Sequence, residues 1–299
     1  MARALSLDPA LSRHSFIDAL KERLQKPVSP VLVPSAAAGS LLENSLDDLT
    51  DLPVPWWHPS DGGRYLGTWH VNVTRDPETG ACNCGIYRMQ ILGNRQSTLS
   101  VSPQSHLARH FAKAEKQGRP LEMAVCIGVS ESLIIAGAAA FPPEACEYNY
   151  AGALDQKPLH LAACRTIDMS VPADAEIVIE GTVRPGIRVN DGPFFDYAGV
   201  PNVNPKALLF EVTAIRHRTN PVFRGCAVGV AGAEDHQVFS VLAPLGLVDF
   251  HGSRTRQTVQ NFLLRNKMFR SLQLFTRAGH VFHPARPNAS AHQEKAGTA

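Results

Sequence analysis

Three polar residues on separate predicted elements could together bind a metal ion: Asn83, His106 and Glu147. We place Asn83 on a strand, His106 in the first turn of a helix and Glu147 in a loop. An amide oxygen, an imidazole and a carboxylate are ligands that suit Mn²⁺ or Mg²⁺ better than a structural Zn²⁺. Spacing alone leaves an alternative open, because a histidine on a helix and a glutamate in a loop are usually solvated.

Two carboxylates form a second group that could do chemistry: Asp191 and Asp196, with a Gly-Pro turn and two phenylalanines between them. Apolar neighbours and a nearby like charge raise the pKa of a carboxyl group, as a proton donor at neutral pH requires. Arg88 could hold one of the two carboxylates ionised. On spacing alone the favoured interpretation is ordinary turn chemistry, with Asp196 facing water.

A predicted hairpin over residues 68–88 must position several of these side chains. Its first strand alternates polar residues, starting with Thr68, with apolar residues, starting with Trp69, as a half-buried strand does. Pro and Gly in the connecting segment are typical of a turn. The second strand carries Asn83 and Arg88. Because a polar face of this kind is unusual on a plain surface sheet, we expect it to look into a site.

The remaining elements follow from periodicity and from capping residues. The sequence predicts helices over residues 15–26, 102–117 (with Ser102 at the N-cap), 131–140 and 254–274. It predicts strands over residues 98–101, 121–128, 173–183, 208–217 and 222–226. Loops are predicted over 144–152 and 184–199, and mixed structure over 234–248.

Composition excludes several classes of protein. The chain has 299 residues, of which 44% are hydrophobic and 19% charged, so it is globular rather than disordered. A formal net charge of +2 gives no electrostatic case for binding nucleic acid. No apolar run reaches the roughly 18 residues of a transmembrane helix, and none at the start resembles a signal peptide. The six cysteines form no Cys-x-x-Cys pair, and we expect reduced thiols in a cytoplasmic protein.

Several long motifs occur in one order between roughly residues 45 and 232. They are Pro53–Tyr65, Thr74–Gly80, Asn83–Gln90, Ala173–Gly181 and Asp191–Gly199. In this order they resemble the UbiD family of decarboxylases. The resemblance implies an α+β fold whose core is a split β-barrel of the flavin-reductase-like, FMN-binding type. A short N-terminal helical segment and a truncated C-terminal helical region would flank this core.

The domain organisation expected from the resemblance has four parts. Residues 1–48 would be an N-terminal helix and linker, 49–235 the domain that binds prenylated FMN, 236–283 a C-terminal strand and helix segment, and 284–299 a disordered tail.

The resemblance also implies the cofactors and their ligands. Prenylated FMN would bind with a divalent metal, Mn²⁺ or Mg²⁺, which bridges its phosphate to the protein, and with K⁺ nearby. By position, Asn83, His106 and Glu147 match the metal ligands. The expected cofactor-binding residues are Thr68, Asn83, Gly85, Ile86, Tyr87, Arg88, Ser105, His106 and Glu147.

The implied activity is reversible non-oxidative decarboxylation of an aromatic or α,β-unsaturated carboxylic acid. The expected catalytic residues are Arg88, Asp191 and Asp196. Arg88 can form a fork to a carboxylate and position it. By resemblance Asp191 would pair with Arg88 and hold it in place, and Asp196 would return a proton to carbon after CO₂ leaves.

Two departures from the family pattern keep a second function open. Asp191 stands where the family has Glu, and a side chain shorter by one methylene shifts the carboxylate. Only about 65 residues follow the matched region, where the family has a further domain. The alternative is a non-catalytic cofactor-binding or scaffold subunit of a multi-subunit (de)carboxylase. Under either reading we expect a flavin prenyltransferase as cofactor supplier, and a homodimer or a partner subunit.

Overall fold

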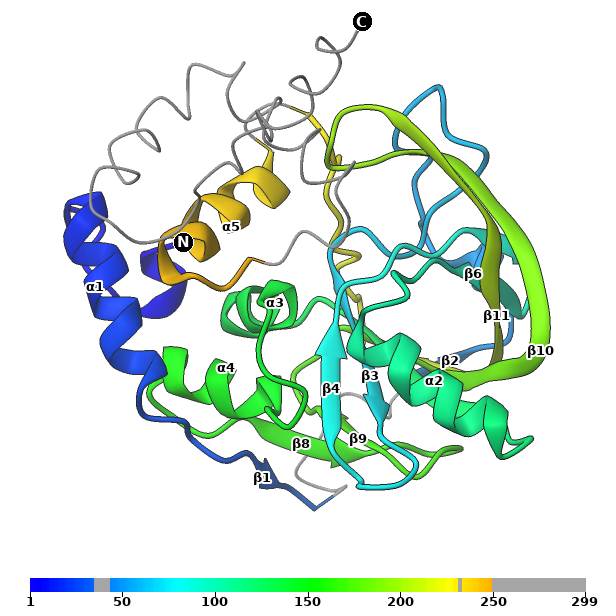
Figure 1. The fold of residues 1–299 in the computed structure, drawn as a ribbon, viewed down its shortest axis with the longest axis horizontal. Helices are drawn as coiled ribbons and strands as arrows, with labels where there is room; N and C mark the ends of the chain where they lie inside the picture. Colours follow the sequence, from blue (N-terminus) through cyan, green and yellow to red (C-terminus); the bar gives the residue numbers. More distant parts are fainter. Residues whose placement is uncertain (35–43, 231–232, 249–299) are drawn as a thin grey trace, which may run out of the picture.

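A strongly curved antiparallel sheet forms the centre of the computed structural model, which describes residues 1–34, 44–230 and 233–248 (Figure 1). The predicted helix 254–274 and the predicted tail 284–299 lie outside the described residues. The strands of the sheet are β2 (Asn44–Leu46), β3 (His70–Arg75), β4 (Cys82–Gly85), β5 (Ile91–Gly93), β6 (Gln96–Leu99), β7 (Leu121–Ile127), β10 (Ile177–Phe195) and β11 (Pro201–His217). Their order is β4-β3-β7-β10-β11-β6-β5, with β2 paired to β11 beside this path. β4 and β5 lie at its two ends, so the described strands form an open sheet.

Five α-helices lie around the sheet in the described residues. They are α1 (Arg13–Leu24), α2 (His106–Lys116), α3 (Glu131–Ala138), α4 (Glu147–Asp155) and α5 (Glu234–Leu242). A separate small sheet contains β1 (Val31–Leu32), β8 (His160–Ala163) and β9 (Ser170–Pro172). The α+β class predicted from the sequence is confirmed. Across the described ranges, no helix combines the length and apolar composition that crossing a bilayer needs.

The longest pairing in the sheet is the hairpin of β10 and β11. Its register runs from Ile177 opposite His217 to Phe195 opposite Pro201, with four shifts along the way. The sequence predicts a loop over residues 184–199, but this is wrong, because β10 continues to Phe195. The Pro and Gly residues that suggest a loop lie at register shifts, where a strand tolerates them.

Two other predicted elements differ from the structure. Residues 144–152 are predicted as a loop, whereas α4 begins at Glu147; it is buried on several sides and therefore lacks an amphipathic stripe. Residues 222–226 are predicted as a strand but form none, because β11 already pairs with β10, β6 and β2.

The N-cap of α2 lies three residues after the one predicted at Ser102. Ser105 caps the helix instead, since its Oγ accepts a hydrogen bond from the N–H of Ala108 at 3.2 Å. His106 is the first residue of the helix and so lies within its first turn, as predicted.

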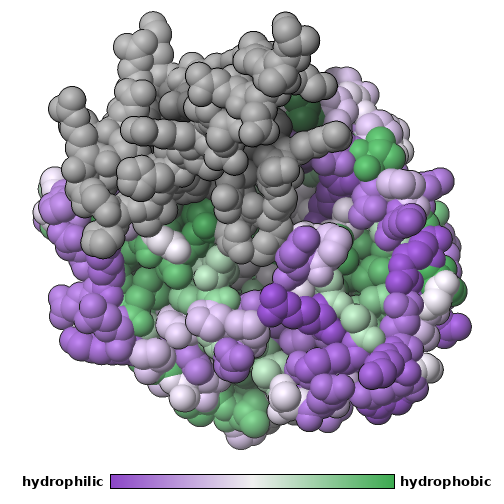
Figure 2. All heavy atoms as spheres, in the orientation of Figure 1, coloured by the Kyte–Doolittle hydropathy of each residue, from purple (hydrophilic) through white to green (hydrophobic). Residues whose placement is uncertain are grey.

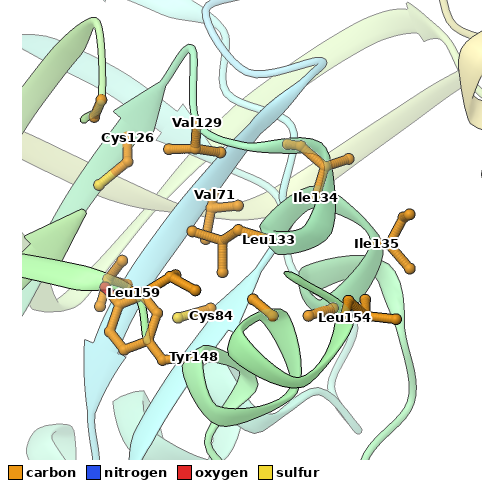
Figure 3. Close-up of a cluster of buried hydrophobic side chains, with 14 of the residues drawn as sticks. Val71, Cys84, Cys126, Val129, Leu133, Ile134, Ile135, Tyr148, Leu154 and Leu159 are labelled. Carbon is orange, nitrogen blue, oxygen red and sulfur yellow. The ribbon is translucent and has the colours of Figure 1, made fainter. Parts of the chain in front are cut away.

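Two apolar clusters pack on opposite faces of the sheet because side chains alternate along its strands. The first cluster joins Val71 of β3 and Cys126 of β7 to residues of α3 and α4 (Figure 3), and it extends to α1 and α5. The second joins Val125 of β7 and Phe210 of β11 to the buried face of α2. On the face in Figure 2, apolar residues gather over α3, with hydrophilic residues over α1 and α2 on either side.

The polar side chains of β3 lie against the second cluster. β3 and β4 pair as the predicted hairpin. Asn72 donates to a methionine sulfur at 3.2 Å, and the Thr74 hydroxyl lies 3.0 Å from Nδ1 of His110 in α2. His70 is fully buried, and desolvation lowers its pKa to about 4. The expectation that this whole face opens to a site is therefore wrong, although Thr68, just before β3, lines the cavity described below.

A buried carboxylate on β10 ties a loop to the sheet. Glu180 accepts hydrogen bonds from the N–H groups of Arg165 (2.9 Å) and Thr166 (2.6 Å). Its Oε1 lies 2.6 Å from Nη2 of Arg216, whose side chain is also buried. Among the described residues, the guanidinium of Arg216 has no partner in hydrogen-bond geometry, so this ion pair compensates its burial.

We predict that Glu180→Gln lowers the free energy of unfolding by about 3–5 kcal/mol, because it leaves the charge of Arg216 buried without a counter-charge. Urea denaturation followed by circular dichroism measures this loss. Asp47→Asn is the control: it removes the fully exposed partner of Arg95 and should change stability by less than about 1 kcal/mol. Equal effects of the two variants would contradict the role of Glu180.

Candidate functional site

A cavity of about 1170 Å³ brings most of the predicted site residues together. It lies where β4 and the start of α2 face the end of the β10–β11 hairpin, α5 and the segment between α3 and α4. Ten of the eleven predicted residues line it, and Asp191 lies directly behind the lining. The ten are Thr68, Asn83, Gly85, Ile86, Tyr87, Arg88, Ser105, His106, Glu147 and Asp196.

The three predicted metal ligands reach the cavity from three elements. Asn83 lies on β4, His106 is the first residue of α2, and Glu147 is the first residue of α4. Glu147 is buried, and its Oε2 accepts a hydrogen bond from the N–H of Cys84 at 2.7 Å. Burial raises the pKa of Glu147 to about 7, and this hydrogen bond offsets part of the shift.

The chemistry of these three side chains fits a divalent cation that is completed by another ligand. Among the described residues there is no group of three or more His, Cys, Asp or Glu side chains that could hold a metal alone. The predicted set supplies two such residues and an amide, which leaves coordination positions for oxygens that the protein does not provide.

Gly85 and Tyr87 shape the wall between these ligands and Arg88. A Cβ at Gly85 would lie 2.5 Å from the ring of Tyr87, so only glycine lets this ring pack over the strand. Burial raises the pKa of Tyr87 to about 12, while contacts with Asn83 and Ser105 lower it in part. The phenol therefore stays neutral and places a hydroxyl beside the proposed ligands. The cavity is larger than a typical small-molecule pocket.

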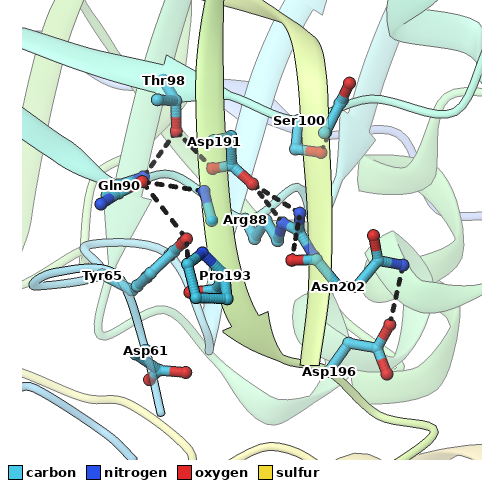
Figure 4. A network of polar contacts seen from close by, with 12 residues as sticks. Asp61, Tyr65, Arg88, Gln90, Thr98, Ser100, Asp191, Pro193, Asp196 and Asn202 are labelled. Carbon is cyan, nitrogen blue, oxygen red and sulfur yellow. Dashed lines mark hydrogen bonds and ion pairs between the residues drawn. The ribbon is translucent and has the colours of Figure 1, made fainter. Parts of the chain in front are cut away.

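Arg88 and Asp191 form the central ion pair of the site (Figure 4). Nε and Nη2 of Arg88 lie 2.7 and 2.5 Å from Oδ1 of Asp191. The Asp191 side chain has no exposed surface, whereas 14% of the Arg88 side chain is exposed. The guanidinium is therefore held from behind and faces the cavity.

Thr98 completes the hydrogen bonding of Asp191. Its hydroxyl accepts a hydrogen bond from the N–H of Gln90 at 2.8 Å, so its own proton is free to go to Oδ2 of Asp191, 2.6 Å away. The Gln90 side chain in turn accepts a hydrogen bond from the N–H of Gly192 at 3.0 Å. Both carboxylate oxygens of Asp191 are thus engaged, as a fully buried charge requires.

Asp196 lines the same cavity at the end of the hairpin. Its carboxylate accepts hydrogen bonds from the N–H of Ala198 at 2.9 Å and from Nδ2 of Asn202 at 3.2 Å. The carbonyl of Asn202 also accepts a hydrogen bond from Arg88 at 3.4 Å, so one residue connects the two predicted catalytic groups. Burial raises the pKa of Asp196, while its hydrogen bonds and the charge of Arg88 lower it in part.

Comparison with known proteins assigns the family. Residues 34–231, more than half of the chain, match the family model described as the UbiD 3-octaprenyl-4-hydroxybenzoate carboxy-lyase Rift-related domain. The chain belongs to the UbiD family. The resemblance seen in the sequence motifs is confirmed.

Solved structures and a curated relative agree with this assignment. The UbiD-class enzyme HmfF from Pelotomaculum thermopropionicum, as an evolved dimeric form in complex with prFMN, is 34% identical with a TM-score of 0.74, over 81% of this chain and 55% of that one. Vanillic acid decarboxylase of Sedimentibacter hydroxybenzoicus is 28% identical with a TM-score of 0.72, over 77% and 50%. Anhydromevalonate phosphate decarboxylase of Methanothermobacter thermautotrophicus is 33% identical over 64% of this chain and 44% of that protein. This UbiD-family chain therefore spans about half the length of its relatives.

Several residues of the site were not found from the sequence. Thr98 and Asn202 contact the predicted catalytic residues from other strands, and no local pattern marks such contacts. Asp235, Val238 and Phe239 of α5 line the cavity, although the sequence predicts only mixed structure there. The apolar spacing of Val238, Val241 and Leu242 was the available signal for a helix.

The raised pKa of Asp196 predicts a pH-dependent effect of Asp196→Asn on stability. A carboxyl group whose pKa is higher in the folded protein binds more protons when folded, so its contribution to stability declines as pH rises above about 4. Relative to wild type, the variant should gain stability as pH rises from 3 to 7, because only the wild type must then ionise a partly buried carboxyl group. Urea unfolding at pH 3, 5 and 7 measures this, with the exposed Asp51→Asn as control. A difference that does not change with pH would contradict the raised pKa.

Proposed function

We propose that this UbiD-family chain binds prenylated FMN in the cavity and catalyses reversible non-oxidative decarboxylation of an aromatic or α,β-unsaturated carboxylic acid. One observation carries the proposal. Arg88, held by Asp191, and Asp196 line the same cavity as the potential metal ligands Asn83, His106 and Glu147. A carboxylate-binding group and an acid thus face a site suited to a phosphate-bearing cofactor.

We propose that the cofactor lies along Thr68 and the Gly85–Arg88 segment, with Ser105 beside its phosphate end. Asn83, His106 and Glu147 would hold Mn²⁺, or Mg²⁺, and the phosphate would supply the missing oxygen ligand, with K⁺ nearby. A bound cation would also favour the ionised form of the desolvated Glu147. When bound, prenylated FMN supplies the electron sink that loss of CO₂ requires. HmfF in complex with prFMN supports this assignment.

The side chains of this chain would have distinct roles in the reaction. Arg88 would bind the substrate carboxylate and orient it, because a guanidinium presents donors in a fixed fork. Asp191 would hold Arg88 in that orientation. Asp196 would deliver a proton to the carbon that has lost CO₂, and its raised pKa keeps a larger share of the carboxyl protonated.

We further infer that residues 49–235 are the cofactor-binding unit and that their curved sheet corresponds to the flavin-reductase-like split barrel. The HmfF form is dimeric, and the vanillic acid decarboxylase is named ShVdcCD, with ShVdcD as a component of its own. We therefore propose a homodimer or a partner subunit for this chain.

Co-expression with a flavin prenyltransferase tests the proposal. The purified protein should show modified-flavin absorbance, contain Mn²⁺ or Mg²⁺ by elemental analysis, and release CO₂ from at least one aromatic or acrylic acid. Glu147→Ala, which removes a proposed metal ligand, should lose metal and flavin together. Absence of flavin from the wild-type protein would contradict the proposal. Bound flavin without turnover on a broad panel of acids would favour the alternative, a cofactor-binding or scaffold subunit.

Asp196→Asn tests the proton donor. The variant should bind flavin as the wild type does, whereas kcat should fall by about 10²–10⁴-fold, the usual contribution of a general acid. Flavin absorbance and CO₂ release measure the two effects. The exposed Asp168→Asn is the control and should keep both. Normal turnover by Asp196→Asn would show that another group returns the proton.

A further inference from the structure

We infer that Asp61 and His236 are positioning residues for Asp196, which they hold through its two neighbours in the chain, Phe195 and Tyr197. The inference rests on the proposed function, in which Asp196 is the proton donor. Neither Asp61 nor His236 lines the cavity, so each would act on the reaction through the backbone beside Asp196.

The end of the hairpin needs such support. The β10–β11 ladder ends at the pair Phe195 and Pro201. Beyond it, the turn is closed by the N–H of Asp196 to the carbonyl of Val200 at 3.2 Å and the N–H of Gly199 to the carbonyl of Asp196 at 2.8 Å. The side-chain hydrogen bonds of Asp196 also stay within the hairpin. Its orientation relative to the rest of the site must therefore come from contacts outside the hairpin.

Asp61 supplies the first of these contacts, from the loop before β3. Its carboxylate is buried, and Oδ1 accepts a hydrogen bond from the N–H of Phe195 at 2.8 Å. Oδ2 accepts a hydrogen bond from the N–H of His58 at 3.0 Å, which ties the carboxylate to its own loop. The next residue, Gly62, donates its N–H to the carbonyl of Pro193 at 2.6 Å. This loop therefore makes hydrogen bonds to β10 at Phe195 and Pro193, just before Asp196.

The side chain of His58 adds further contacts between this loop and the residues around Asp196. Its ring lies 4.6 Å from that of Phe195, centroid to centroid, and its Nε2 lies 2.9 Å from the carbonyl of Val228. The sequence motif Pro53–Tyr65 thus includes residues that hold the backbone next to Asp196. This explains why a loop rich in Pro and Gly keeps a buried carboxylate at position 61.

His236 supplies the second contact, from α5. Its Nε2 lies 3.0 Å from the carbonyl oxygen of Tyr197, and the His236 side chain is buried. Because a carbonyl oxygen only accepts hydrogen bonds, Nε2 carries the proton in this contact. The rings of Tyr197 and Phe239, also on α5, lie 5.6 Å apart.

The segment before α5 packs against the backbone of Asp196 itself. Asp235 accepts a hydrogen bond from the N–H of Gly229 at 3.1 Å. Gly229 has a φ of +82°, and a Cβ there would lie 2.2 Å from the carbonyl oxygen of Asp196. α5 lies beyond residue 231, where the match to the UbiD domain model ends. A segment after the matched domain therefore contacts the residue that follows the proposed acid.

The test combines a structural readout with kinetics in the full-length chain. Hydrogen exchange of the cofactor-free protein reports on the amides of Asp196 and Gly199. In His236→Ala and in Asp61→Asn these amides should exchange about fivefold faster, the effect of losing one hydrogen bond. His236→Gln, which keeps an N–H donor, should restore protection. Ser60→Ala, at an exposed position beside Asp61, should behave as wild type.

In the flavin-loaded enzyme, the same two variants should lower kcat by about tenfold to a hundredfold, as a displaced catalytic group does, with KM and flavin content little changed. Wild-type exchange and wild-type kcat in both variants would overturn the inference, as would faster exchange spread over the whole chain. If exchange at 196–199 rises as expected in the two variants but neither they nor the wild type release CO₂, the positioning of Asp196 by Asp61 and His236 is supported and the proposed function is contradicted. Circular dichroism confirms that each variant is folded.

Discussion

The ion pair of Arg88 and Asp191 is the contact on which the arrangement of the site depends. A carboxylate with no exposed surface is tolerated only when an opposite charge and hydrogen bonds replace its lost hydration. Arg88 and Thr98 provide both, and they lie 103 and 93 residues away in the chain. The buried charge therefore requires three distant segments to meet at one point. That requirement places β10 beside the segment that follows β4.

The site lies at the seam between the two apolar clusters rather than within either of them. On one side, Glu147 is the first residue of α4, and its carboxylate accepts a hydrogen bond from the N–H of Cys84, a residue of the first cluster. On the other, Asp196 ends a hairpin whose strands contribute to the second. Desolvation raises the pKa of both carboxyl groups. Burial favours the protonated form of both groups: on Asp196 this would serve the proposed proton donor, whereas at Glu147 a bound cation would have to offset it.

Sequence patterns predicted best where structure is local. Alternation predicted the β3–β4 hairpin, and the motif residues from Asn83 to Arg88 all lie along one wall of the cavity. Patterns failed where a partner far along the chain decides the outcome. Residues 184–195 read as a loop because their Pro and Gly are accommodated only by pairing with β11. The alternation predicts that the polar face of β3 looks into a site, whereas Thr74 is satisfied by His110 of α2 inside the fold.

From the residues alone one can establish membership of the UbiD family, the types of side chain available for chemistry and the local elements that carry them, because motifs and periodicity are properties of neighbouring residues. Only the folded chain decides which of those side chains meet. It places Asn83, His106 and Glu147 on one cavity, buries Asp191 behind Arg88, and brings Asp61 and His236 to either side of Asp196. These contacts join segments far apart in sequence, and their cause is the need of buried charges and backbone groups for partners.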